Sequence, residues 1–162
     1  MSELTKLSEQ VAKLLLQRQQ LLAVAESCTG GWLAKCLTDL PGSSQWFERG
    51  FVTYSNAAKQ EMLGVRSATL LRTGAVSKDV VQEMASGVLT HSRADIAVAI
   101  SGIAGPGGAV PGKPVGTVCL AWATKDNFQL QETRHFEGDR EAVRQQSVVC
   151  ALQGLLDVLG AD

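Results

Sequence analysis

Residues 20–33 read Gln-Leu-Leu-Ala-Val-Ala-Glu-Ser-Cys-Thr-Gly-Gly-Trp-Leu, and this stretch decides the fold. The short apolar run over 20–26 is typical of a strand that is buried on both faces. Polar residues and two glycines follow, and apolar residues then return at helical spacing over 29–40 until Pro41-Gly42 ends the pattern. We therefore predict a buried strand, a tight turn and a helix, which together form a building block of α/β proteins.

The same alternation continues on both sides of this unit, with apolar runs that predict strands and amphipathic stretches that predict helices. Further helices are expected over 3–19, over 56–63, over 78–91 with Ser77 as N-cap, and from Asp139 to the C-terminus; further strands are expected over 47–55, 95–100, 115–123 and 128–136. The last two strands are joined by Thr124 to Asn127, which is too short for a crossover, so they should pair antiparallel.

Five helices can cover both faces of such a sheet. The predicted fold is a three-layer α/β/α sandwich around a mixed, mostly parallel five-stranded sheet. A chain of 162 residues fits one domain, so we expect a single domain over 1–162.

Composition and charge exclude several classes of protein. The chain is 45% hydrophobic and 19% charged, as in ordinary globular proteins, and its formal net charge of −1 gives no electrostatic footprint for nucleic acid or an anionic membrane. Charged residues interrupt the N-terminal stretch, and no apolar run is long enough for a signal peptide or a membrane span. We expect a cytoplasmic protein with no nucleic-acid or membrane partner. Its four cysteines and two histidines are dispersed, so no metal site is expected.

Ligands of open α/β sheets bind beyond the carboxyl ends of the parallel strands, and the first such end carries Ser27. Cys28, Thr29, Gly30 and Gly31 follow it. Glycines allow a ligand to approach the backbone closely, and a helix that begins near Thr29 would offer unpaired amides to a phosphate or an oxyanion. Plain helix capping by Ser27 or Thr29 explains the same residues equally well.

A serine nucleophile needs a base, and the next strand end offers one. Neither histidine lies near a predicted strand end with a carboxylate partner, so a Ser-His-Asp triad has weak support. Lys59 could accept the proton if burial lowers its pKa, with the Tyr54 hydroxyl assisting. Taken singly, a solvated helix lysine and an ordinary strand tyrosine are the simpler interpretations.

Glycines also follow the strand that ends near residue 100. The segment from Ser101 to Gly108 contains four of them, which indicates close backbone approach to a ligand or merely a flexible loop. It does not have the spacing of a P-loop. Farther along, Arg140 and Arg144 share one helix face, where they could bind a phosphate or simply form a solvated, ion-paired surface.

Taken in order, these segments resemble the CinA C-terminal domain family over nearly the whole chain. The resemblance is carried by Glu26-Ser27-Cys28-Thr29-Gly30-Gly31, Gly50-Phe51-Val52-Thr53-Tyr54-Ser55-Asn56, Ala58-Lys59, Leu63-Gly64-Val65, Gly74-Ala75-Val76-Ser77, Ser101-Gly102-Ile103-Ala104-Gly105-Pro106, Lys113-Pro114-Val115-Gly116 and Gly138-Asp139-Arg140. The chain departs from the usual family pattern after Pro106, where relatives often have an acidic residue and then two glycines.

The resemblance implies a three-layer α/β/α fold and hydrolysis of the carboxamide of nicotinamide mononucleotide, without a metal or organic cofactor. It assigns the nucleophile to Ser27, the base to Lys59 and an assisting role to Tyr54. Residues expected to bind substrate are Cys28, Thr29, Gly30, Gly31, Asn56, Ser101, Gly102, Gly105 and Arg140.

Two alternatives stay open at this point. Cys28 could be the nucleophile, because thiols are strong nucleophiles and helix N-termini lower their pKa. The chain could instead be a non-catalytic nucleotide-binding module that acts through partners. Apolar surface on the flanking helices could also support a homodimer.

Overall fold

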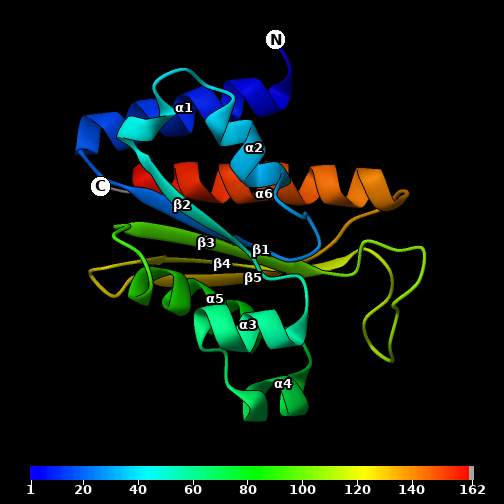
Figure 1. Cartoon of the computed structure of the whole chain (residues 1–162). Coiled ribbons are helices and arrows are strands. Elements are labelled where there is room, and N and C mark those ends of the chain that lie inside the picture. Colours follow the sequence, from blue (N-terminus) through cyan, green and yellow to red (C-terminus); the bar gives the residue numbers. More distant parts are fainter. Residues whose placement is uncertain (161–162) are drawn as a thin grey trace.

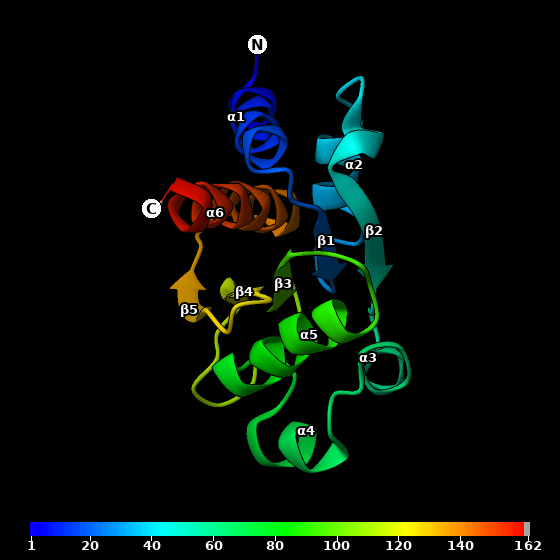
Figure 2. The same cartoon turned by 90° about the vertical axis from the view of Figure 1, so that its left-hand side faces the viewer.

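A computed structural model describes residues 1–160, so the last two residues of the expected 1–162 domain lie outside the described range. Its helices form a layer on each side of a central sheet (Figure 1). On one side lie α1 (Glu3–Arg18), α2 (Trp32–Thr38) and α6 (Arg140–Gly160); on the other lie α3 (Asn56–Leu63), α4 (Ser67–Thr73) and α5 (Lys78–Thr90), as the turned view in Figure 2 shows. The three-layer α/β/α prediction is confirmed.

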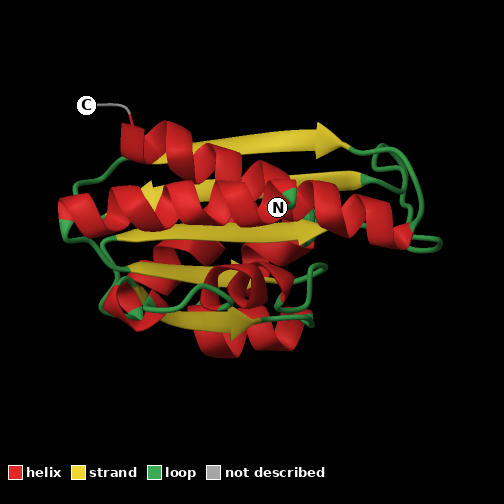
Figure 3. Cartoon of the chain, turned by 90° about the horizontal axis from the view of Figure 1, so that it is seen from above, coloured by secondary structure: helices red, strands yellow, loops and turns green. Residues whose placement is uncertain are grey.

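The sheet has the strand order β2-β1-β3-β4-β5, and Figure 3 shows it from above. Its strands are β1 (Leu22–Glu26), β2 (Phe47–Val52), β3 (Ile96–Gly102), β4 (Thr117–Thr124) and β5 (Gln129–His135). Strand β1 pairs parallel with β2 and β3, whereas β4 pairs antiparallel with β3 and β5. The mixed sheet and the antiparallel final hairpin are as predicted, and only β4 runs against the other strands.

The two faces of the sheet carry side chains of different size. Along β3, Ile96, Val98 and Ile100 pack toward the layer of α1, α2 and α6, while Ala97 and Ala99 pack toward α5. Successive side chains of a strand point to opposite faces, so this alternation separates two hydrophobic cores. The alanine face lets the backbone of α5 approach the sheet closely, and all of these residues are buried.

Two helix predictions need correction. Helix α2 begins at Trp32 rather than at residue 29, because Gly30 and Gly31 have φ values of 61° and 104° that a helix does not allow. Helix α4 was not predicted, so the described chain has six α-helices instead of five. The sequence of α4 does not show the usual amphipathic pattern, in which apolar residues are buried and polar residues exposed. Leu71 is 85% exposed, while Thr69 is buried.

The remaining boundaries agree closely with the predictions, with one difference that matters for the site. Ser77 caps α5 by accepting from the Val80 amide (3.1 Å), and Asp139 accepts from the Ala142 amide (2.9 Å) at the start of α6. Strand β2 ends at Val52 rather than at residue 55, so Thr53 and Tyr54 lie in the turn that leads to α3. None of the helices in the described chain combines the length and apolar character needed to cross a membrane.

Candidate active site

The carboxyl ends of β1, β2 and β3 meet at one edge of the sheet, where they form a pocket of about 300 Å³. Its lining joins the three segments that the sequence singled out, together with the start of α6. The lining residues are Ser27, Cys28, Tyr54, Asn56, Lys59, Ala75, Val76, Ser101, Gly102, Ile103, Ala104, Gly105, Gly107, Gly108 and Arg140.

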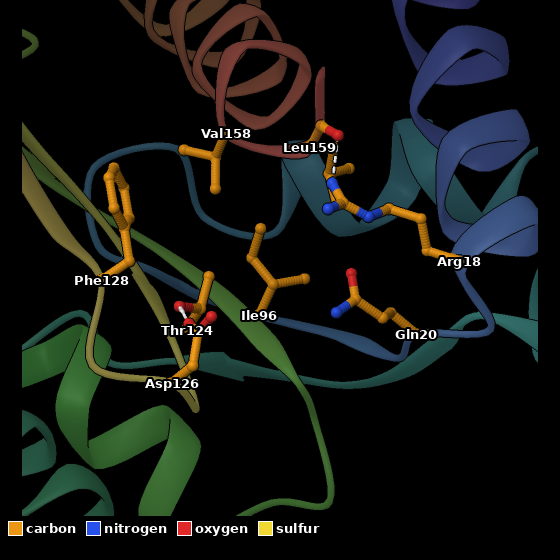
Figure 4. Close-up of a pocket in the computed structure, with 8 residues that line it drawn as sticks. All are labelled: Arg18, Gln20, Ile96, Thr124, Asp126, Phe128, Val158 and Leu159. Carbon is orange, nitrogen blue, oxygen red and sulfur yellow. Dashed lines mark hydrogen bonds between the residues drawn. The ribbon is translucent and has the colours of Figure 1, made fainter. Parts of the chain in front are cut away.

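A second cavity, of about 170 Å³, lies at the opposite edge of the sheet, where Ile96 begins β3 and Thr124 ends β4 (Figure 4). Two of its polar groups are bonded within the protein: Arg18 donates to the carbonyl of Leu159, and the Thr124 hydroxyl donates to Asp126. The Thr124–Asp126 pair is exposed and lies within one turn, whereas the first pocket brings together side chains from several segments. The chemistry therefore points to the first pocket.

Lys59 and Ser27 form the centre of that pocket. The Lys59 Nζ donates to Ser27 Oγ at 3.0 Å and also to the carbonyls of Thr53 (2.9 Å) and Tyr54 (3.3 Å). Ser55 accepts from the Ala58 amide and so fixes the start of α3, the helix that carries Lys59. A hydroxyl at hydrogen-bond distance from an amine is the arrangement of a nucleophile and its base.

The surroundings of Lys59 favour its neutral form. Its side chain is buried, with 1% exposure, and burial lowers the pKa of this amine below its ordinary value. Within residues 1–160, no carboxylate lies at ion-pair distance from its Nζ to oppose that effect. A lowered pKa makes more of the neutral amine available to accept a proton.

The thiol of Cys28 lies beside this pair but in a setting that keeps it protonated. Burial raises the pKa of Cys28 to about 11, although its own backbone amide and Arg144 act in the opposite direction. The side chain packs into the core on the α6 side of the sheet. A protonated thiol is a weak nucleophile.

The amides at the start of α2 do not face the pocket, contrary to our expectation. The Glu26 carboxylate accepts hydrogen bonds from the Leu33 amide (2.9 Å), the Ala34 amide (3.0 Å) and the Thr29 hydroxyl (2.7 Å). The Glu26 carboxylate therefore binds the helix amides that we expected to bind a phosphate or an oxyanion. Thr29, Gly30 and Gly31, which we expected to bind substrate, are not among the residues that line the pocket.

The Tyr54 side chain is also placed differently from the expectation. Its backbone carbonyl contacts Lys59 Nζ, but its hydroxyl accepts from Arg140 Nη2 at 3.0 Å. The other guanidinium nitrogen of Arg140 donates to the Gly105 carbonyl at 2.8 Å. Arg140 thus joins the turn after β2 to the loop after β3 at the pocket mouth.

Arg144 faces the nucleophile turn from α6 and does not line the pocket. Its guanidinium donates to the carbonyls of Cys28 (3.0 Å) and Thr29 (3.2 Å) and lies 5.8 Å from the centre of the Trp32 ring. The two arginines that the sequence grouped together therefore have separate roles.

The loop over 103–116 forms the outer wall of the pocket. Lys113 Nζ donates to the Thr73 carbonyl at 2.6 Å, which ties the loop to the end of α4. Gly105 has a φ of +85°, and a Cβ there would lie 2.5 Å from Val115 Cγ1. Only glycine fits this position without moving the wall. Apolar side chains of Val76 and Ile103 complete the lining.

The sequence analysis missed the part that two residues take in this site: Glu26, and Arg144, which it grouped with Arg140 as a candidate phosphate ligand. Glu26 had a visible signal, since it is a lone carboxylate at the end of an apolar run. Arg144 had no comparable signal for its contact with the nucleophile turn. Across residues 1–160, no group of three or more His, Cys, Asp or Glu side chains is placed to hold a metal ion.

Comparison with known proteins identifies the family of this chain. The CinA C-terminal domain family matches residues 4–159. The chain belongs to this family. It is 58% identical over 154 residues to nicotinamide-nucleotide amidohydrolase PncC of Escherichia coli strain K12, covering 95% of this chain and 93% of the relative. It is 49% identical over 158 residues to the protein of the same name from Pseudomonas putida, covering 98% of each.

Solved structures of the family have the same fold. A CinA superfamily protein from Klebsiella pneumoniae 700603 superposes with a TM-score of 0.94 at 42% identity, covering 98% of this chain and 99% of that one. A competence/damage inducible protein from Agrobacterium tumefaciens gives a TM-score of 0.94 at 41% identity, covering 99% and 97%. The predicted family and fold are both confirmed.

Proposed function

We propose that this protein hydrolyses the carboxamide of nicotinamide mononucleotide to nicotinate mononucleotide and ammonia, with Ser27 as nucleophile and Lys59 as base. The observation that carries the proposal is the 3.0 Å contact between Lys59 Nζ and Ser27 Oγ in a buried site. Relatives at 58% and 49% identity bear the name of this activity.

The reaction would begin with neutral Lys59 accepting the proton of the Ser27 hydroxyl while Oγ attacks the carboxamide carbon. The carbon–nitrogen bond of the tetrahedral intermediate then breaks, and protonated Lys59 delivers its proton to the departing nitrogen, which leaves as ammonia. Lys59 next removes a proton from a water molecule, which attacks the carbonyl carbon of the nicotinoyl ester. The bond from that carbon to Ser27 Oγ then breaks, and protonated Lys59 returns its proton to Oγ as the acid leaves.

The Cys28 amide and amides of the loop after β3 are the candidates for stabilising the intermediate. The Cys28 amide directly follows the nucleophile and is bonded to its own thiol, and the Ala104 and Gly105 amides, in the pocket lining, donate to no other backbone group among residues 1–160. In serine hydrolases of other folds, the amide after the nucleophile often stabilises the oxyanion. The amides of α2 cannot take this role because Glu26 and Thr29 engage them.

The pocket walls fit the two ends of the substrate. Val76 and Ile103 offer apolar surface for a pyridine ring, whereas Arg140 at the mouth offers charge and hydrogen bonds to a phosphate. Asn56, Ser101, Gly102 and Gly105 also line the pocket and complete the proposed binding surface. We place the reaction in cytoplasmic pyridine-nucleotide salvage.

Ammonia release on addition of nicotinamide mononucleotide tests the proposal directly, with wild type compared against Ser27→Ala. We expect turnover in wild type and a loss of several orders of magnitude in the variant. Turnover that survives in Ser27→Ala would remove Ser27 as nucleophile. Binding without ammonia release in wild type would instead support a nucleotide-binding module.

A further inference from the structure

Glu26 is the last residue of β1 and directly precedes the nucleophile, yet it does not line the pocket. Its side chain is 1% exposed, and both carboxylate oxygens accept hydrogen bonds. One oxygen accepts from the Thr29 hydroxyl and the Leu33 amide, and the other accepts from the Ala34 amide. A single side chain thus fixes the turn that follows Ser27 and the start of α2.

A carboxylate in this position is costly unless it is well bonded. Removing a charge from water is unfavourable, and hydrogen bonds or ion pairs must offset the loss of hydration. In the described chain, no Lys, Arg or His lies at ion-pair distance from Glu26. Most helices can be capped by an uncharged side chain such as serine, which would avoid the unfavourable burial of a charge. Here a buried carboxylate caps α2 directly beside the nucleophile.

The backbone of Glu26 also links the nucleophile to the base. Its carbonyl accepts from the Thr53 amide at 2.9 Å, and the Thr53 carbonyl accepts from Lys59 Nζ at 2.9 Å. The next amide, that of Ser27, donates to the Ile100 carbonyl at 3.0 Å. The position of Glu26 therefore sets where Ser27 Oγ lies relative to Lys59 Nζ.

We propose that Glu26 is a positioning residue of the hydrolysis, whose buried carboxylate holds the turn after β1 so that Ser27 stays in hydrogen-bond contact with Lys59. This inference rests on the proposed function, because the pair that it positions is the proposed nucleophile and base. Glu26 touches neither the pocket nor the reacting atoms, so its contribution acts through Ser27.

Glu26→Gln is the informative variant, because it keeps the shape of the side chain and removes one acceptor oxygen. One of the amides of Leu33 and Ala34 would then face an NH₂ group and lose its partner. Glu83→Gln is a matched control. Glu83 accepts from the Arg66 amide (2.8 Å) and the Thr69 hydroxyl (2.5 Å) at the start of α4, away from Ser27.

Steady-state kinetics with nicotinamide mononucleotide should separate the two variants. We expect both to lower the unfolding temperature. Glu26→Gln should reduce kcat about tenfold to a hundredfold with KM within about threefold, because small misplacements of reacting groups have effects of this size. Glu83→Gln should leave kcat within about twofold. Equal kcat values in the two variants would overturn the proposal.

A second measurement does not depend on turnover. In a Ser27→Cys, Cys28→Ala background, the thiol at position 27 should be activated by Lys59 and react with iodoacetamide, as followed by peptide mass spectrometry. Adding Glu26→Gln should slow this alkylation several-fold, while adding Glu83→Gln should not. An unchanged or faster reaction would mean that Glu26 only maintains the fold.

The outcomes distinguish the two proposals. If wild type releases no ammonia but Glu26→Gln still slows alkylation at position 27, the proposed function fails and the positioning role stands. If wild type releases ammonia while Glu26→Gln changes neither kcat nor alkylation, the positioning role fails and the proposed function stands.

Discussion

The Arg140 guanidinium donates a hydrogen bond of 3.0 Å to the Tyr54 hydroxyl, although the two residues lie 86 positions apart in the sequence. The bond joins the start of α6 to the turn after β2 at the mouth of the pocket. Because the Tyr54 side chain is 60% exposed, this contact rather than burial holds its ring in place. Tyr54 and Arg140 should therefore act on the substrate as a unit.

A double-mutant cycle tests that coupling. Tyr54→Phe and Arg140→Gln should each lower kcat/KM for nicotinamide mononucleotide about tenfold, and the double variant should be little worse than the poorer single one. Arg134→Gln, which removes an exposed arginine bonded to Glu132 on β5, serves as the control and should have no effect. Losses that simply multiply in the double variant would show that the two side chains act separately.

The pH dependence of the rate should report Lys59. Because the base must be neutral, kcat/KM should rise with pH through the pKa of Lys59, which burial lowers below the ordinary lysine value. Lys59→Arg should abolish turnover, since a guanidinium stays protonated throughout. Lys35→Met changes an exposed lysine on α2 and should leave the profile unchanged. A flat profile in wild type would contradict the assignment.

The same lowered pKa makes a prediction about stability. The unfolded chain keeps the lysine proton up to a pKa of about 10.4, whereas the folded chain releases it at lower pH. Between the two pKa values the unfolded state binds more protons, so the free energy of unfolding rises with pH. Denaturant unfolding of wild type and Lys59→Met should show wild type gaining stability relative to the variant as pH rises through this window. A constant difference would place the pKa of Lys59 near its ordinary value.

The neighbouring thiol should prove dispensable. Because burial raises the pKa of Cys28 to about 11, the thiol is almost wholly protonated at neutral pH. Cys28→Ala should therefore keep kcat within about threefold of wild type, in contrast to Ser27→Ala. Alkylation of Cys28 in the wild-type protein should be slow and should accelerate with pH. Loss of turnover in Cys28→Ala would instead support the alternative that the Cys28 thiol is the nucleophile.

Most of the fold could be predicted because its signals are local. Strands β1 and β3 are each a continuous run of apolar residues. Helix α5 shows helical spacing of apolar residues within a single short segment. Helix α4 could not be found this way, because its buried Thr69 donates to Glu83, which lies 14 residues farther along the chain. The start of α2 was predicted too early, because the group that caps it is not adjacent to it. The cap is the carboxylate of Glu26, which precedes the two glycines in the sequence.

In the site, too, the features that depend on local sequence could be predicted and those that depend on distant residues could not. Ser27 and Lys59 could be proposed because each follows a predicted strand end, and the structure brings them within 3.0 Å. The direction in which a side chain points could not be predicted. The Tyr54 hydroxyl faces Arg140 instead of Lys59, and Arg144 faces the Cys28 carbonyl instead of the pocket.

Hydrogen bonds of Lys113, Gly105 and Gly116 tie the loop over 103–116 to the rest of the protein. A Cβ added at Gly107 or Gly112 would have no atom within 4 Å. The nucleophile and base come from other segments, the end of β1 and helix α3. Part of the pocket lining, Gly107 and Gly108, therefore lies on a stretch of chain that carries neither reacting group. Exchanging residues 106–112 with those of a relative should change KM for nicotinamide mononucleotide more than kcat.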